Sequence, residues 1–184
     1  MKITAFLGSP RARGNTDILA ERLLDGARDA GWETESVALR SLKIRGCIAC
    51  ESCWRDGKPC AINDDMQELY NTIASSDVLV FATPVYWYAP TAIMKAFIDR
   101  LVPFNRPKGR PLVKGKSVIV VTAYEEEGPE AAETLLRVFE MSFAYLEVIN
   151  IGTIIVDGVG PKGAVLDKAE VLDNAYQLGR SLQL

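Results

Sequence analysis

The fold is decided near the start of the chain, by the stretch Gly8-Ser9-Pro10-Arg11-Ala12-Arg13-Gly14-Asn15-Thr16. This stretch joins a short apolar run, Ile3 to Leu7, to a helical pattern that opens near Asp17. Such a loop is suited to hold an anion, because glycine allows close backbone approach and the first helical turn points unpaired N–H groups into the loop. Hydroxyl, amide and guanidinium groups add further donors. We therefore expect a phosphate site formed by Ser9, Arg11, Arg13, Gly14, Asn15 and Thr16.

Strand-like and helical runs alternate along the rest of the chain. Apolar runs predict strands at 2–7, 33–39, 77–83, 116–122 and 147–156. Helical spacing predicts helices over about 17–31, 63–73, 91–100, 129–145 and 166–182. Three of the strands are strongly apolar, which is typical of parallel strands that are buried on both faces. The order predicts a three-layer α/β fold, in which helices cover both faces of an open five-stranded parallel sheet.

Composition and charge narrow the possible classes of protein. The chain has 184 residues, of which 48% are hydrophobic, and this suits one domain over residues 1–184 with a sizeable core. A net charge of −3 without any basic run gives no reason to expect nucleic acid as a partner. The start of the sequence has no charged and then apolar leader, and no apolar segment approaches the roughly 20 residues of a membrane span. We expect a cytoplasmic protein without membrane attachment.

Histidine is absent from the sequence. Its absence excludes Ser-His and Cys-His mechanisms and removes the commonest acid/base group at neutral pH. We therefore assign no catalytic side chain and expect a bound cofactor to supply the chemistry.

Ligands of open parallel sheets bind beyond the carboxyl ends of the strands, at the point where the strand order reverses. We expect the order 2-1-3-4-5, which puts this point between the first and third strands. Three loops converge there: the phosphate loop, residues 84–90, and the residues from Ala123 onward. The second loop suits a flat aromatic ring, since Tyr86, Trp87 and Tyr88 offer stacking surfaces.

Two segments carry a resemblance to a known family. They are Gly8 to Thr16, and Thr83-Pro84-Val85-Tyr86-Trp87 followed by Lys95-Ala96-Phe97-Ile98-Asp99-Arg100. Together they resemble the signature segments of the NADPH-dependent FMN reductase branch of flavodoxin-like proteins, and the resemblance extends over nearly the whole chain. It implies a flavodoxin-like fold and an FMN-dependent oxidoreductase that takes electrons from NAD(P)H and passes them to a small acceptor. It also implies a homodimer or homotetramer.

The same resemblance assigns the residues that contact the flavin. The phosphate would be held by Ser9, Arg11, Asn15 and Thr16. The isoalloxazine would lie against Pro84, Val85, Tyr86 and Trp87. Ala123 and Tyr124 of the third loop complete the predicted set.

All four cysteines fall within an aperiodic segment at about 43–62, which we interpret as an insertion. They form the pattern C-x2-C-x2-C-x6-C, with Cys47, Cys50, Cys53 and Cys60. One short stretch of chain can wrap an iron–sulfur cube and place sulfurs on three of its irons, whereas zinc more often uses two separated C-x2-C pairs. Zinc and free or disulfide-paired thiols are the alternatives, and disulfides are the weakest permanent state in a reducing cytoplasm.

This cysteine pattern also resembles the compact motif of archaeal and bacterial iron–sulfur flavoproteins, a subgroup of the same family. These proteins carry a [4Fe-4S] cluster near the FMN. The resemblance assigns all four cysteines as cluster ligands, and it implies ferredoxin as an alternative electron donor.

Two other functions fit parts of the sequence. A flavodoxin-type carrier would exchange electrons with protein partners but would turn over little NADPH. A zinc or thiol-switch regulator on this scaffold would bind no flavin.

One glycine-rich motif resembles a dinucleotide-binding fingerprint but lacks its context. Gly158-Val159-Gly160-Pro161-Lys162-Gly163 fits G-x-G-x-x-G, but no strand follows it and no acidic residue stands about 20 positions on. We interpret it as a glycine-rich connection.

Overall fold

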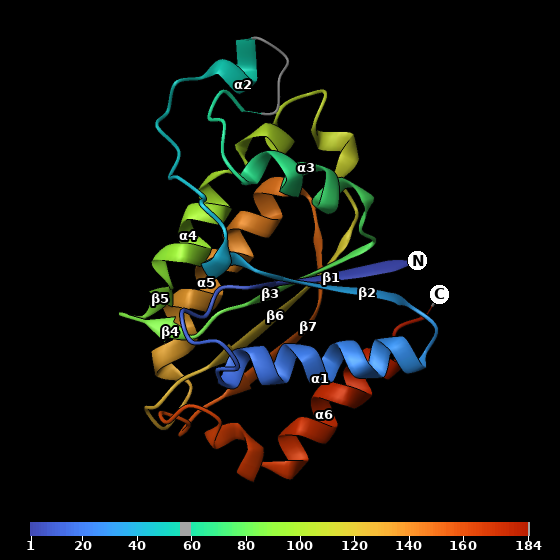
Figure 1. Cartoon of the computed structure of the whole chain (residues 1–184), viewed down its shortest axis with the longest axis vertical. Coiled ribbons are helices and arrows are strands. Elements are labelled where there is room, and N and C mark those ends of the chain that lie inside the picture. Colours follow the sequence, from blue (N-terminus) through green and yellow to red (C-terminus); the bar gives the residue numbers. More distant parts are fainter. Residues whose placement is uncertain (56–59, 184) are drawn as a thin grey trace.

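A computed structural model describes residues 1–55 and 60–183 of the chain (Figure 1). Within these residues, five parallel strands form one sheet in the order β2-β1-β3-β6-β7. They are β1 (Lys2–Leu7), β2 (Glu33–Ala38), β3 (Val78–Ala82), β6 (Ser117–Ala123) and β7 (Ile149–Val156). Since β4 and β5 form a separate hairpin, this order is the predicted 2-1-3-4-5, and the prediction is confirmed.

Helices cover both faces of the sheet, as the sequence predicts (Figure 1). One face carries α1 (Asn15–Asp29) and α6 (Ala169–Arg180), and the other carries α3 (Met66–Ser75), α4 (Ala92–Asp99) and α5 (Glu130–Leu146). Shorter helices lie in the connections: η1 (Leu39–Ser41), α2 (Ser52–Arg55), η2 (Val102–Asn105), η3 (Arg110–Leu112) and η4 (Ala164–Asp167). In the part of the chain that the structure describes, no helix is both long and apolar enough to cross a membrane.

The alternation of side chains along the strands divides the core into two layers. In β1, Ile3 and Ala5 pack with α1 and α6, whereas Phe6 packs with residues of α3, α4 and α5. The ring of Phe6 lies 4.7 Å from that of Phe97, measured between centroids. Strand β3 is buried at every position, because it lies in the middle of the sheet with a helical layer on each side.

Two details differ from the sequence prediction. The hairpin of β4 (Val85–Tyr86) and β5 (Ala89–Pro90) is absent from the prediction, because strands of two residues are too short to show a periodic pattern. The closing helix begins at Ala169 rather than at Leu166. The chain first forms η4, which follows Gly163 in the left-handed region at φ = 82°.

Two glycines allow α1 and α6 to cross closely. A Cβ on Gly26 of α1 would lie 2.0 Å from the carbonyl oxygen of Tyr176. A Cβ on Gly179 of α6 would lie 1.9 Å from the carbonyl oxygen of Leu23. Because both neighbours are backbone atoms, they cannot move aside as the end of a flexible side chain could. The contact between the two helices therefore depends on the absence of two side chains.

We predict that Gly26→Ala and Gly179→Ala each lower the free energy of unfolding by about 1 to 3 kcal/mol, since the added methyl group forces the helices apart. Urea unfolding monitored by circular dichroism measures the loss. Gly46→Ala is the matched control, because a Cβ there would meet nothing within 4 Å. Equal midpoints for all three variants would contradict the prediction.

Candidate functional site

The carboxyl ends of β1, β3 and β6 lie at one level of the sheet. Leu7 pairs with Ala82, and Ala82 pairs with Val121. The loops that follow these strands therefore begin side by side, where the strand order reverses. They enclose a cavity, here called the loop cavity, which is lined by Ser9, Arg11, Gly14, Asn15, Thr16, Pro84, Val85, Tyr86, Ala123, Tyr124, Glu125, Val159, Gly160 and Lys162. Every residue of the predicted flavin set except Arg13 and Trp87 lies among them.

The phosphate loop presents hydroxyl and backbone donors to the loop cavity. The N-cap of α1 is Gly14, which has no side chain that could accept a hydrogen bond from the N–H groups of the first helical turn. Thr16 is 1% exposed, and its Oγ1 has no hydrogen-bond partner in the described part of the chain. A buried hydroxyl without a partner costs about 1 to 3 kcal/mol. Its place in the lining of this cavity marks a position where an acceptor is needed.

Thr91 connects the phosphate loop to the second loop. Its hydroxyl donates to the Gly8 carbonyl at 2.7 Å and accepts from the Met94 N–H at 3.2 Å, which caps α4. The Thr91 N–H donates to Thr83 Oγ1 at 3.2 Å. A Cβ on Gly8 would lie 2.9 Å from two atoms of Met94, so the loop backbone rests directly on α4. These contacts fix the spacing between the two loops.

We predict that Thr91→Val lowers the free energy of unfolding by about 2 kcal/mol, because α4 loses its cap and the buried Gly8 carbonyl loses its donor. Thr91→Ser keeps the hydroxyl and should lose clearly less. Denaturant titrations of both variants and the unchanged protein measure the difference. Equal losses in the two variants would contradict the prediction, because they would show that the hydroxyl contributes no more to stability than the methyl group.

The glycine-rich connection 158–163 forms a further wall of the loop cavity, which the sequence did not predict. Asn15 Nδ2 donates to the carbonyls of Val159 and Pro161 at 2.8 and 3.0 Å. Arg11 Nη1 donates to the Gly160 carbonyl at 3.1 Å. The amide side chain of Asn15 is therefore engaged in holding this connection. The residues that sequence reasoning missed are Glu125, Val159, Gly160 and Lys162.

The hairpin of β4 and β5 presents aromatic side chains beside the loop cavity. Trp87 and Tyr88 form its turn at φ = 51° and 60°. Non-glycine residues adopt this left-handed region at a cost of about 1 kcal/mol or more each. Trp87 is 94% exposed, and it lies outside the loop cavity. With Val85, Tyr88, Tyr124, Glu125 and Glu126 it lines an adjoining cavity, here called the outer cavity.

Arg13 is the other predicted residue that the structure keeps apart from the loop cavity. Its N–H donates to Asp17 Oδ2 at 3.0 Å, and its side chain lines a groove along α1. Asp17 also accepts from Arg40 at 2.9 Å. Burial raises the pKa of Asp17, although the Arg40 charge and the Arg13 N–H oppose the shift. Arg13 thus belongs to the contacts that support the phosphate loop on the side away from the loop cavity.

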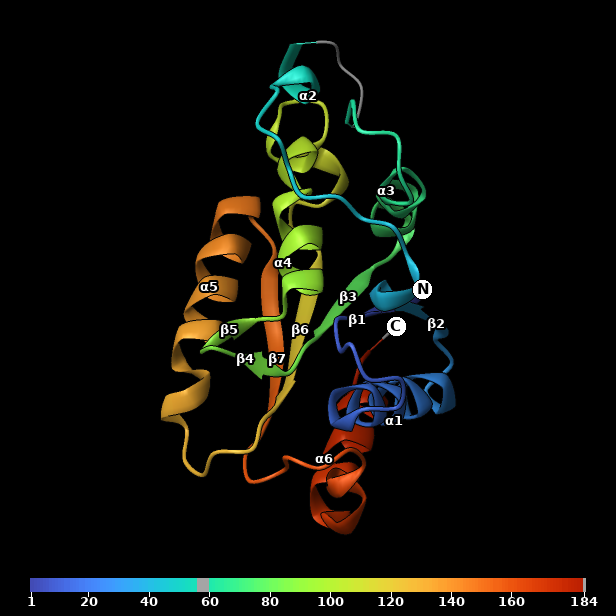
Figure 2. The same ribbon diagram turned by 60° about the vertical axis from the view of Figure 1, so that its left-hand side comes forward.

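The four cysteines line a second cavity, here called the cysteine cavity, together with Tyr70 and Arg100. Asp99 and Arg100 line it at the C-terminal end of α4. Figure 2 shows that this end of the helix points away from the hairpin of β4 and β5. Cys47 and Cys50 are exposed, Cys53 and Cys60 are half-buried, and none of the four forms a disulfide within the described residues. Within residues 1–55 and 60–183, no three Cys, His, Asp or Glu side chains are arranged as ligands of one metal ion. Residues 56–59 of the predicted insertion lie outside the described residues.

The cysteine thiols differ in their ionisation. Hydrogen bonds from Ser52 hold the pKa of the Cys50 thiol below its usual range. Burial raises the pKa of the Cys53 thiol, and the neighbouring charges of Cys60 and Cys47 raise it further. All three of these thiols line the cysteine cavity.

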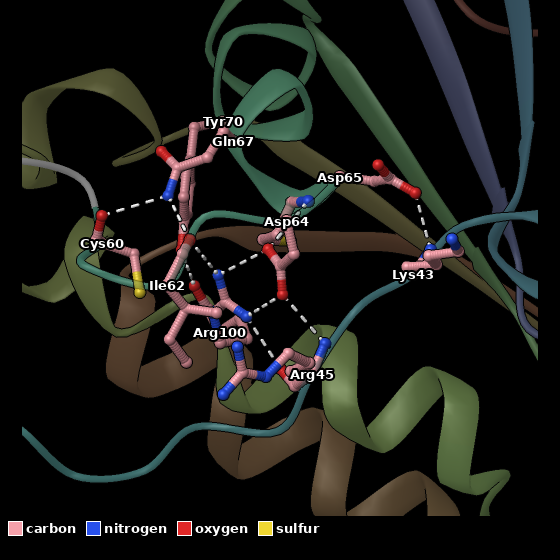
Figure 3. Close-up of polar contacts among 10 residues, drawn as sticks. Lys43, Arg45, Cys60, Ile62, Asp64, Asp65, Gln67, Tyr70 and Arg100 are labelled. Carbon is pink, nitrogen blue, oxygen red and sulfur yellow. Dashed lines mark hydrogen bonds and ion pairs between the residues drawn. The ribbon is translucent and has the colours of Figure 1, made fainter.

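A buried ion pair closes the cysteine segment at its base (Figure 3). Arg100 Nη1 and Nη2 donate to the two carboxylate oxygens of Asp64 at 2.7 and 2.9 Å, and both side chains are at most 3% exposed. Arg100 Nη1 also donates to the Arg45 carbonyl at 2.7 Å, and the Arg45 N–H donates to Asp64 Oδ2 at 2.9 Å. Since Arg45 precedes the first cysteine and Asp64 follows the last, one ion pair joins the two ends of the segment.

Two polar side chains reinforce this closure (Figure 3). Gln67 Nε2 donates to the Cys60 carbonyl at 3.0 Å. Asp65 Oδ2 accepts from the Lys43 N–H at 2.6 Å. Backbone groups on both sides of the cysteines are therefore bound to residues at the start of α3.

The ion pair predicts a pH dependence of stability. Burial alone would raise the pKa of Asp64, but the hydrogen bonds from Arg100 and the Arg45 N–H outweigh it and hold the pKa below its ordinary value of 3.8. Between the pKa of Asp64 in the folded protein and its ordinary value in the unfolded chain, the folded protein binds fewer protons than the unfolded chain. The contribution of the ion pair to stability is therefore complete above about pH 4 and is lost as the pH falls.

We predict that Asp64→Asn costs about 3 to 5 kcal/mol at neutral pH, because it leaves Arg100 buried without a counter-charge. The difference from the unchanged protein should shrink as the pH falls below about 4, because Asp64 is then protonated in the unfolded chain before it is protonated in the folded protein. Urea unfolding at a series of pH values measures it. Asp25→Asn, which removes an exposed pair with Arg28, serves as the control and should change little. A difference for Asp64→Asn that is constant with pH would contradict the prediction.

Comparison with known proteins identifies the family. The chain matches the family model for NADPH-dependent FMN reductases over residues 1–157. An iron-sulfur flavoprotein from Archaeoglobus fulgidus is 37% identical over 184 residues, which cover 99% of this chain and 79% of that protein. An iron-sulfur flavoprotein from Methanosarcina thermophila is 38% identical over 106 residues, or 58% of this chain and 55% of that protein. The chain belongs to the NADPH-dependent FMN reductase family, as the sequence predicts, and it is an FMN-dependent oxidoreductase.

Solved structures share the fold. The NAD(P)H:quinone oxidoreductase from Methanothermobacter marburgensis has a TM-score of 0.77 at 21% identity, and the match covers 100% of this chain and 96% of that one. The Trp repressor binding protein from Bacillus subtilis has a TM-score of 0.72 at 22% identity, with full coverage of both chains. At these identities the likeness shows the fold alone, and it agrees with the flavodoxin-like strand order.

Proposed function

We propose that this oxidoreductase binds FMN in the loop cavity and a [4Fe-4S] cluster on Cys47, Cys50, Cys53 and Cys60. It takes electrons from NAD(P)H or ferredoxin and delivers them to a small-molecule acceptor. The observation that carries the proposal is that one helix connects the two sites. Helix α4 begins where Thr91 binds the Gly8 carbonyl of the phosphate loop, and it ends at the cysteine cavity, which Asp99 and Arg100 line. Its 8 residues span about 12 Å.

The phosphate of FMN suits the start of α1. Thr16 offers a buried hydroxyl without a partner in the described chain. Ser9 offers a second hydroxyl, which in the structure donates to the Arg11 carbonyl at 3.2 Å. The first turn of α1 adds N–H groups and the positive end of the helix dipole. Arg11 and Lys162 line the same cavity and supply positive charge. Asn15 contributes through its backbone, because its side chain holds the 158–163 connection.

The isoalloxazine ring suits the space between the second and third loops. Pro84, Val85 and Tyr86 supply one wall, and Ala123 and Tyr124 supply another. When bound, FMN supplies the two-electron redox chemistry and a [4Fe-4S] cluster supplies one-electron transfer. No side chain has to act as acid or base, in keeping with a sequence without histidine. The outer cavity, which Trp87 lines, adjoins the ring site and would admit the acceptor.

Three further properties belong to the same proposal. Residues 1–184 form one domain, with the cysteine segment as an insertion in it. The protein works in the cytoplasm, and it assembles as a homodimer or homotetramer. The family resemblance supports the assembly, and the composition supports a single core.

We predict that Thr16→Val raises the dissociation constant of FMN at least about tenfold, because the phosphate loses a buried donor. Riboflavin, which lacks the phosphate, should bind both proteins equally. Titration of the flavin-free protein with each flavin, followed by quenching of flavin fluorescence, measures both constants. Thr153→Val on β7 is the matched control, since Thr153 is exposed and lines neither cavity. Equal weakening of FMN and riboflavin would contradict the phosphate assignment.

We predict that Cys50→Ser loses iron and sulfide but keeps FMN, because the cysteine cavity and the loop cavity lie at opposite ends of α4. Iron, acid-labile sulfide, zinc and FMN per chain are assayed after anaerobic purification. The flavin content serves as the internal control for folding. Equimolar zinc without sulfide in the unchanged protein would contradict the cluster and favour the zinc alternative.

A further inference from the structure

Arg100 follows the last residue of α4 and is the largest of the fully buried side chains. Its guanidinium donates to the carbonyl of Arg45 on one side of the cysteine segment. On the other side it binds the carboxylate of Asp64 and approaches the Ile62 carbonyl at 3.5 Å. A buried arginine is therefore the common partner of both ends of the segment (Figure 3).

The same side chain reaches the cysteine cavity. Arg100 lines this cavity together with all four cysteines. The Nη1 and Nη2 atoms are engaged with Asp64 and backbone carbonyls, whereas the buried Nε–H has no partner in the described part of the chain. An unmet donor on a buried cation is costly, and a thiolate or sulfide in the cavity would accept from it.

Tyr70 connects Arg100 to the last cysteine. Its hydroxyl donates to the Arg100 carbonyl at 2.9 Å. Tyr70 and Cys60 line the cysteine cavity together, and Gln67, in the same helix as Tyr70, donates to the Cys60 carbonyl at 3.0 Å. Cys60 is separated from the other three cysteines by the longest spacing of the motif. It is thus held on the side of the cysteine cavity that Arg100 lines.

We propose that Arg100 is the positioning residue of the cysteine cavity: with Asp64 it closes the segment that carries the four thiols, and it presents positive charge and an Nε–H donor to the sulfur-bound group. This inference rests on the cluster assignment in the proposed function. Lysine could not replace Arg100, because an ammonium is a point charge and cannot form a fork with a carboxylate while also binding two carbonyls.

The test compares Arg100→Lys with the double variant Asp64→Leu/Arg100→Met. The double variant removes both charges together, so the fold does not have to bury an unpaired ion. Arg110→Lys is the matched control, because the hydrogen bonds of Arg110 go to Tyr145, Glu147 and Asn105. FMN content reports the integrity of the fold in every variant.

Three readouts are taken. Amide hydrogen exchange in protein freed of metal reports the closure: peptides covering 43–47 and 60–65 should exchange about tenfold faster in both Arg100 variants, while peptides covering 8–16 keep their rates. Iron and sulfide per chain should fall to less than about half after equal anaerobic reconstitution, since the four thiols are no longer held together. In double-variant molecules that retain the cluster, its reduction potential should be lower than in the unchanged protein, because the N–H donor is lost while the net charge of the pair stays zero.

Unchanged exchange together with unchanged iron and sulfide in the double variant would overturn the proposal. Lower iron content with an unchanged reduction potential would overturn the role of Arg100 as a donor to the sulfur-bound group and leave only the closure. If the unchanged protein takes up neither iron nor sulfide, the cluster in the proposed function fails, and the role as donor fails with it. The exchange rates, which require no metal, then decide the closure by themselves.

Discussion

The hydrogen bond from the Thr91 hydroxyl to the Gly8 carbonyl is the contact on which the arrangement of both sites depends. It is buried, and it fixes the N-terminus of α4 against the loop that follows β1. At the other end of the helix, Arg100 binds both ends of the cysteine segment. Because a short helix behaves as a rigid rod between these two anchors, the loop cavity and the cysteine cavity keep a fixed separation.

The cysteine segment raises a second physical constraint. A stretch with little regular structure must still find partners for its backbone groups where it meets the core. Asp64 and Arg100 provide these partners: the carboxylate accepts from the Arg45 N–H, and the guanidinium donates to the Arg45 carbonyl. Arginine suits this place, because its planar fork offers five donors and remains charged when buried. Burial of the Asp64–Arg100 pair costs desolvation free energy, and the pair defines the geometry of the loop.

The sequence predicts the sheet well, because β1, β3 and β6 are apolar at nearly every position and central strands are identified by this pattern. It also predicts which three loops meet, since parallel strands end at the same edge. It does not predict the 158–163 wall. Asn15 and Val159 lie 144 positions apart, and only the folded chain brings them together. Trp87 carries a local aromatic signal, but its placement depends on a hairpin turn at positive φ that no sequence pattern marks.

We infer that one chain holds two redox centres, a flavin beside the start of α4 and a cluster at its end. Anaerobic reductive titration of the purified protein tests it most directly, by counting the electrons taken up per chain as the visible spectrum bleaches. Since FMN accepts two electrons and a [4Fe-4S] cluster accepts one, we predict an uptake of about three reducing equivalents per chain. An uptake of about two, complete when the flavin absorption is gone, would contradict it.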